Sequence, residues 1–139
     1  MSMYDPKPLP KRALIAVTSA HKPLYPDNKE TGLFITEALH PYNVFVDAGL
    51  QVDFVSETGT YQPDWLSQQD KWLNGEDKAA WEGSKGDFKA KLDKLYTAGD
   101  VDPDQVSLSF ISKYGDRRVL ERLNLEHLPR IVSQQSQFF

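Results

Sequence analysis

The spacing of apolar residues predicts a strand, a helix and a second strand in the first half of the chain. Residues 13–19 (ALIAVTS) form a short, almost continuous apolar run, which is typical of a buried strand in a parallel sheet. Residues 31–48 then place apolar side chains at helical spacing after a Thr-Gly pair that can begin a helix. Gly49 ends that helix, and residues 51–56 (QVDFVS) predict the second strand. This order indicates a right-handed βαβ unit.

Pro41 lies inside the helical pattern. A proline ring clashes with the carbonyl of the residue four positions earlier, here Glu37, and proline has no backbone N–H to donate. We therefore expect the helix to kink or split at Pro41.

The second half of the chain predicts shorter elements. Residues 57–75 indicate a loop with short helical pieces, and residues 87–96 a lysine-rich helix. Residues 106–110 alternate apolar side chains with serines, a pattern that favours a half-buried edge strand over a central one. Residues 116–128 predict an amphipathic helix that ends before a proline.

Length and composition exclude several classes of protein. A chain of 139 residues with 40% hydrophobic and 26% charged residues fits one globular domain. The net charge of −4, without a run of like charges, disfavours nucleic acid or an anionic membrane as a partner. The sequence has no long apolar run for a transmembrane helix and no apolar secretory leader, so we expect a cytoplasmic protein, with the nucleus as an alternative location.

The sequence lacks the motifs expected of a metal-binding or nucleotide-binding protein. The chain has no cysteine, which excludes disulfides, cysteine-ligated zinc, iron–sulfur clusters and a cysteine nucleophile within it. The three histidines, His21, His40 and His127, do not have metal-ligand spacing. Neither a Walker A nor a GxGxxG sequence is present, so we expect no cofactor and no metal.

Glu37 is the candidate catalytic residue. It lies on the apolar stripe of its helix, between Phe34 and Pro41, where a carboxylate must be paired, protonated or able to reach water. One interpretation is a glutamate at the edge of the stripe that reaches solvent. The other is a general acid or base near the carboxyl end of the first strand, where open parallel sheets bind their ligands.

Four segments together resemble the ThiJ/PfpI superfamily, and within it the fungal branch of glutathione-independent glyoxalases, also described as stress-induced and chaperone-like. They are residues 13–19, 31–41 (TGLFITEALHP), 51–59 (QVDFVSETG) and 72–77 (WLNGED), and the resemblance covers residues 11–105. It implies an α/β fold, a flavodoxin-like three-layer sandwich similar to class I glutamine amidotransferases, truncated here and beginning β-α-β.

The resemblance also implies an activity, that of a glyoxalase III or D-lactate dehydratase, which is a lyase. Such an enzyme converts methylglyoxal, a small aldehyde, to D-lactate without glutathione. A cysteine attacks the aldehyde, the hemithioacetal rearranges by proton transfer, and a glutamate and a histidine assist. The glutamate of the family motif falls on Glu37. Relatives that dimerise make a homodimer an expectation too.

The chain departs from the family in its last third. The family cysteine and histidine come from a strand–turn–helix elbow that this sequence lacks, so we expect no glyoxalase activity from the chain as written. We accordingly divide it into residues 1–105, the N-terminal part of a ThiJ/PfpI-like domain, and residues 106–139, an unmatched tail.

Two origins of the tail remain open. Residues 105–107 (Gln-Val-Ser) can be encoded by CAG-GTA-AGT, the consensus of a eukaryotic 5′ splice donor, so the tail could be translated from a retained intron or a shifted frame. Alternatively the tail is genuine, residues 106–110 supply a third strand, and the protein is a non-enzymatic chaperone-like or interaction module. A Glu37-only enzyme acting on another aldehyde is a third alternative.

Overall fold

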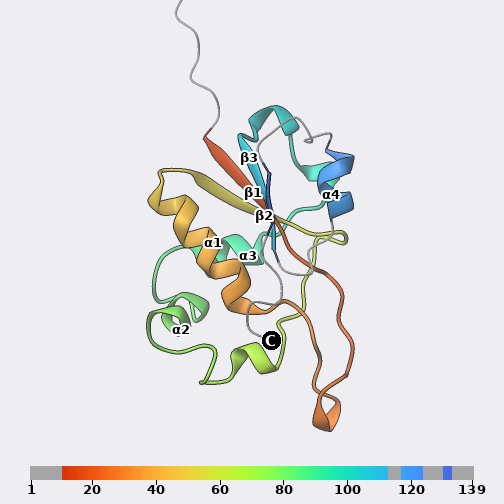
Figure 1. Cartoon of the computed structure of the whole chain (residues 1–139), viewed down its shortest axis with the longest axis vertical. Helices are drawn as coiled ribbons and strands as arrows, with labels where there is room; N and C mark the ends of the chain where they lie inside the picture. The colour runs from red at the N-terminus through yellow and green to blue at the C-terminus, as the bar shows by residue number, and fades with distance from the viewer. Residues whose placement is uncertain (1–10, 113–116, 124–129, 133–139) are drawn as a thin grey trace, which may run out of the picture.

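The computed structural model describes residues 11–112, 117–123 and 130–132. Its centre is a parallel sheet of four strands in the order β2-β1-β3-β4. The strands are β1 (Arg12–Ala16), β2 (Gln51–Val55), β3 (Leu108–Ile111) and β4 (Arg130–Val132). The predicted strand–helix–strand unit is confirmed, because β1 and β2 pair in parallel with helix α1 (Ile35–Asp47) between them in the chain (Figure 1).

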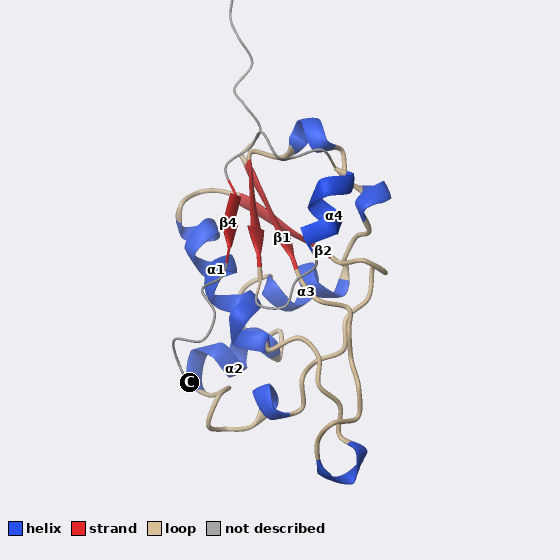
Figure 2. Ribbon diagram, turned by 45° about the vertical axis from the view of Figure 1, so that its right-hand side comes forward, coloured by secondary structure: helices blue, strands red, loops and turns tan. Residues whose placement is uncertain are grey.

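Helices cover both faces of the sheet and make three layers (Figure 2). Helix α1, with α2 (Gly75–Trp81) and α3 (Phe88–Asp93), contributes to the larger apolar cluster, and α4 (Arg117–Arg122) to the smaller one on the other face. Short 3-10 helices occupy residues 26–28, 66–68, 98–100 and 103–105. The expected flavodoxin-like three-layer α/β sandwich is therefore confirmed, with each face of β1 buried against its own cluster.

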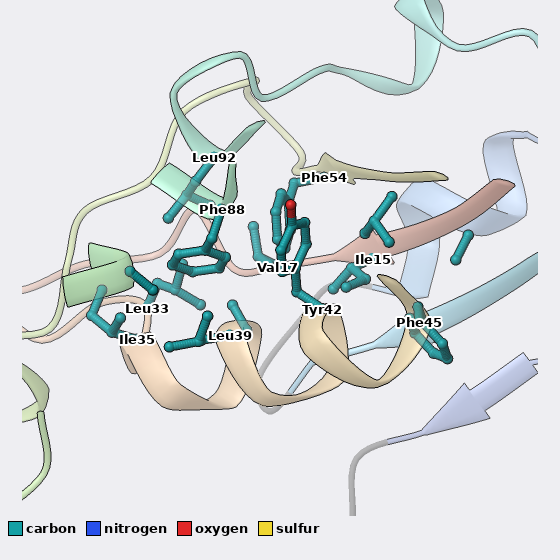
Figure 3. Close-up of a cluster of buried hydrophobic side chains, with 14 of the residues drawn as sticks. Ile15, Val17, Leu33, Ile35, Leu39, Tyr42, Phe45, Phe54, Phe88 and Leu92 are labelled. Atoms are coloured by element: carbon teal, nitrogen blue, oxygen red, sulfur yellow. The ribbon is translucent and has the colours of Figure 1, made fainter. Parts of the chain in front are cut away.

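The larger cluster is built on aromatic rings from α1, β2 and α3 (Figure 3). Tyr42 stacks on Phe54 with ring centroids 5.9 Å apart, and Phe88 packs edge-on against Phe54 at 5.7 Å. Offset and edge-to-face ring contacts stabilise a core beyond the area they bury. This cluster fixes α1 against β1 and β2.

The predicted start of α1 is wrong, and of the predicted kink or split at Pro41 the split is wrong. The helix begins at Ile35 and not at the Thr-Gly pair, because Leu33 forms a β-bridge with Pro63 and holds that stretch extended. The Leu33 N–H donates to the Gln62 carbonyl at 2.7 Å, and the Asp64 N–H donates to the Leu33 carbonyl at 2.8 Å. The helix also runs continuously from Ile35 to Asp47 with Pro41 inside it, so the predicted split does not occur.

The prediction of an edge strand near residue 108 is also wrong. β3 lies between β1 and β4, and its fully buried positions are Ser109 and Ile111. Leu108 and Phe110 are half-buried and pack against the larger cluster. The serine alternation suggested a solvent-facing side, but Ser109 is buried. The predicted helix over 116–128 is present as α4, and residues 124–129 lie outside the described residues.

Candidate active site

Glu37 lies where two neighbouring strands end. It is in the first turn of α1 and its residue is half-buried. Its backbone carbonyl accepts a hydrogen bond from the Ser112 hydroxyl at 3.2 Å. Ser112 follows β3, and its N–H donates to the carbonyl of Ala16, the last residue of β1, at 2.9 Å. The backbone of Glu37 is thus held at the carboxyl edge of the sheet.

Three buried hydroxyl residues line this edge, one after each of β1, β2 and β3: Thr18, Ser56 and Ser112. Thr18 Oγ1 accepts from the Ala20 N–H at 3.0 Å, and Ser56 Oγ donates to the Thr60 carbonyl at 2.8 Å. Each hydroxyl therefore already stabilises backbone near the edge. None of the three was predicted, because a single serine or threonine at a strand end has no distinctive spacing.

An ion pair crosses the same edge from β2 to α4. Glu57 Oε1 lies 2.8 Å from an Nη of Arg122. The other carboxylate oxygen, Oε2, is buried and has no hydrogen-bond partner among the described residues. The sequence did not indicate this pair, since its partners are far apart in the chain and meet only when α4 packs on the sheet.

A buried carboxylate fixes the segment that leads into α1. Asp64 is 6% exposed and accepts hydrogen bonds from the Tyr25 hydroxyl, the Gly32 N–H and the Ser67 N–H, at distances from 3.1 to 3.2 Å. These donors satisfy the oxygens of a carboxylate that burial removes from water. The network determines where the chain enters α1, and so where Glu37 lies.

The two histidines that the structure describes lie in separate ion pairs. His21 pairs with Glu30 at 3.0 Å and His40 with Asp77 at 2.9 Å, both on the surface, while His127 lies outside the described residues. Within residues 11–112, 117–123 and 130–132, no group of three or more His, Asp or Glu side chains could hold a metal ion. Nor is any helix of that part of the chain both long and apolar enough to cross a membrane.

Comparison with known proteins finds sequence relatives over part of their length. No protein-family model matches the chain. It is 41% identical over 103 residues to the glutathione-independent glyoxalase HSP31 of Saccharomyces cerevisiae, a match that covers 74% of this chain and 44% of HSP31. It is 35% identical over 122 residues to Glyoxalase 3 of Candida albicans, which covers 88% of this chain and 51% of that protein. The chain is thus similar in sequence to part of the glutathione-independent glyoxalases.

The fold gives the same relationship. The crystal structure of glyoxalase III from Candida albicans superposes with a TM-score of 0.74 at 34% identity, covering 84% of this chain and 52% of that one. The chain spans about half the length of the glyoxalases that it matches.

Proposed function

We propose that Glu37 is the acid/base residue of a site for small aldehydes such as methylglyoxal, and that this chain alone does not convert methylglyoxal to D-lactate. One observation supports both parts: Glu37 lies at the carboxyl edge of a parallel sheet in a chain without any cysteine. Open α/β sheets bind ligands at that edge. We propose the cytoplasm or nucleus as the location of this function.

The chemistry explains why a carboxylate is insufficient. In the glutathione-independent reaction a thiolate adds to the aldehyde carbon of methylglyoxal and forms a hemithioacetal. A proton then moves from that carbon to the neighbouring ketone carbon, and the hydroxyl proton of the hemithioacetal moves to the ketone oxygen. The ketone thereby becomes an alcohol and the hemithioacetal becomes a thioester. Water cleaves the thioester into lactate and the thiol, so no external oxidant is needed. Glu37 can move the proton, but a carboxylate does not replace the nucleophilic thiolate.

The test of activity is D-lactate formation from methylglyoxal by the purified 139-residue chain without glutathione. We expect no D-lactate above the buffer rate from the wild type, from Glu37→Gln, or from Glu76→Gln, which changes an exposed glutamate of α2. D-lactate formation that Glu37→Gln alone abolishes would overturn the predicted inactivity. Formation that survives Glu37→Gln would overturn the assignment of Glu37 as well.

The test of the aldehyde site is binding. Hydroxyacetone resembles methylglyoxal but has no aldehyde to modify lysine or arginine. We expect it to shift amide resonances around Glu37 and Ser112 in the wild type and in Glu76→Gln, and to leave them unchanged in Glu37→Gln. Shifts of equal size in all three proteins would contradict a role for Glu37 in binding.

Exposed apolar side chains favour a second candidate function, a chaperone-like module. Leu24 is 71% exposed, Val44 63%, Val46 43% and Trp72 40%. Such side chains can hold unfolded clients or pair two copies of the chain. If they act as a holdase, the chain suppresses aggregation of a heat-denatured client, and Leu24→Ser with Val44→Ser removes the effect. Sedimentation of the same variants tests the proposed homodimer, since loss of the apolar residues would yield monomers.

A further inference from the structure

We infer that Ser112 is a positioning residue for Glu37, and that it has this role because of Pro41. The inference rests on the proposed role of Glu37 and adds to it the group that holds this residue in place. It also gives a structural role to a residue beyond position 105.

The need for such a group follows from the helix. In an α-helix the carbonyl of residue 37 would accept the N–H of residue 41, but Pro41 has none. A carbonyl that loses this donor inside a packed protein must find another partner or carry a desolvation penalty.

Ser112 supplies that partner from a different layer of the molecule. It is 1% exposed, and its hydroxyl donates to the Glu37 carbonyl at 3.2 Å. Its own backbone is fixed by the N–H bond to Ala16 at the end of β1. The hydrogen bond therefore connects the first turn of α1 directly to the carboxyl ends of β1 and β3, and it sets the position of Glu37 relative to that edge.

Ser109 is the matched control within the chain. It lies on β3, is 0% exposed, and its hydroxyl has no hydrogen-bond partner among the described residues. Ser109→Ala and Ser112→Ala make the same chemical change at equally buried positions of the same segment. Only the second removes the donor to Glu37.

The experiment is a double-mutant cycle on Ser112 and Pro41, with urea unfolding and the carbonyl carbon shift of residue 37 as readouts. We expect Ser112→Ala to lower the folding equilibrium constant about tenfold, the usual size for a lost buried hydrogen bond. The carbonyl resonance of Glu37 should move upfield. Ser109→Ala should leave both readouts unchanged, and Ser112→Thr, which keeps a hydroxyl, should retain the wild-type shift.

Pro41→Ala provides the decisive comparison. Residue 41 then has an N–H for the Glu37 carbonyl, so in this background Ser112→Ala should change the folding constant less than about twofold. If Ser112→Ala alone fails to fold, the double variant should fold and show a hydrogen-bonded Glu37 carbonyl. An undiminished effect of Ser112→Ala in the Pro41→Ala background, or a Glu37 shift that does not respond to Ser112→Ala, would overturn the inference.

The two proposals fail separately. D-lactate formation that survives Glu37→Gln overturns the proposed function and leaves the Ser112 measurement standing. A Glu37 carbonyl shift that does not change in Ser112→Ala overturns the positioning role of Ser112. That result has no bearing on the activity and binding tests of Glu37.

Discussion

At the scale of single residues, Asp53 is a buried charge with two cationic partners. It lies on β2, is 7% exposed, and its carboxylate is 3.2 Å from Arg12 Nε and 3.2 Å from Lys91 Nζ. Removing one member of such a set leaves the remaining charges without compensation. Because Arg12 and Lys91 are about one-third exposed or more, water screens part of that effect.

We predict that Asp53→Asn lowers the free energy of unfolding by about 2 kcal/mol. The matched control is Asp93→Asn, which breaks the exposed pair between Lys89 and Asp93 and should change stability by less than about 1 kcal/mol. Urea unfolding at neutral pH measures both. Equal losses of unfolding free energy in the two variants would mean that the burial of Asp53 does not increase its contribution to stability.

Tyr42 gives a prediction about alkaline pH. Burial raises the pKa of its hydroxyl, and the nearby carboxylates of Asp87 and Asp53 raise it further. The folded state therefore holds the Tyr42 proton above the unfolded pKa of about 10, whereas the unfolded state releases it. This contribution to stability is complete below about pH 10 and falls as the pH rises beyond it. We expect Tyr42→Phe to reduce the loss of stability between about pH 9 and 11, measured by urea unfolding, and a loss identical to the wild type would contradict it.

At the scale of elements, the start of α1 depends on one close backbone contact. A Cβ on Gly32 would lie 1.9 Å from the carbonyl oxygen of Gln62, and backbone cannot move aside cheaply. Gly32→Ala should therefore destabilise the protein by about 3 kcal/mol and displace the first turn of α1. At Gly99 the nearest atom is 3.9 Å away, so Gly99→Ala should be nearly neutral. Thermal unfolding compares the two, and a tolerated Gly32→Ala would show that the bridge to Gln62 opens easily.

The loop between β1 and α1 projects from the sheet (Figure 1) and is tied down by a tyrosine. Tyr25 donates from its hydroxyl to Asp64 and packs its ring on Trp65, with centroids 5.3 Å apart. Tyr25→Phe keeps the ring contact and removes the hydrogen bonds. We expect trypsin to cleave the loop faster at Lys29 in this variant, with the cleavage rate at exposed Lys71 as the internal control. Unchanged rates in the loop would contradict a role for the hydroxyl.

Sequence patterns predicted the helices and strands that are determined by residues close together in the chain. The apolar run of β1 and the helical spacing of α1 are properties of neighbouring residues, and both elements are present. The start of α1, its continuity through Pro41 and the central place of β3 were predicted wrongly. The first and the third depend on a partner far along the chain, which is Pro63 for the start of α1 and β4 for the central place of β3.

In the candidate site, too, only features determined by neighbouring residues could be predicted from the sequence. Glu37 could be found because its position on an apolar stripe and the TGLFITEALHP segment are local signals. The Ser112 hydroxyl and the Glu57–Arg122 pair could not, because each joins residues from separate elements. A buried serine looks the same in the sequence whether or not its hydroxyl has a partner, as Ser112 and Ser109 demonstrate.

At the scale of the whole molecule, we propose that the residues described beyond position 105 fold as one unit with those before it. Val119 and Leu123 pack with Leu14 and Ala16 of β1 in the smaller apolar cluster. The Glu57–Arg122 pair crosses the same boundary. The match to Glyoxalase 3 spans 122 residues and so extends beyond residue 105 wherever it begins. These observations favour a genuine segment over translated intron, and reading codons 105–107 in the genomic DNA tests that choice directly.

The tryptophans allow a sharper test of a single folding unit, because all three, Trp65, Trp72 and Trp81, precede residue 105. Val119 is 0% exposed on α4, so Val119→Ala should lower the free energy of unfolding by about 2 kcal/mol. If the chain unfolds as one unit, tryptophan fluorescence must report that whole loss although no tryptophan lies near α4 in the sequence. Glu121→Ala, on the exposed side of α4, should leave the transition unchanged. A fluorescence transition that is the same in Val119→Ala as in the wild type would mean that residues 1–105 fold independently. The central position of β3 would then contribute nothing to the stability of the sheet.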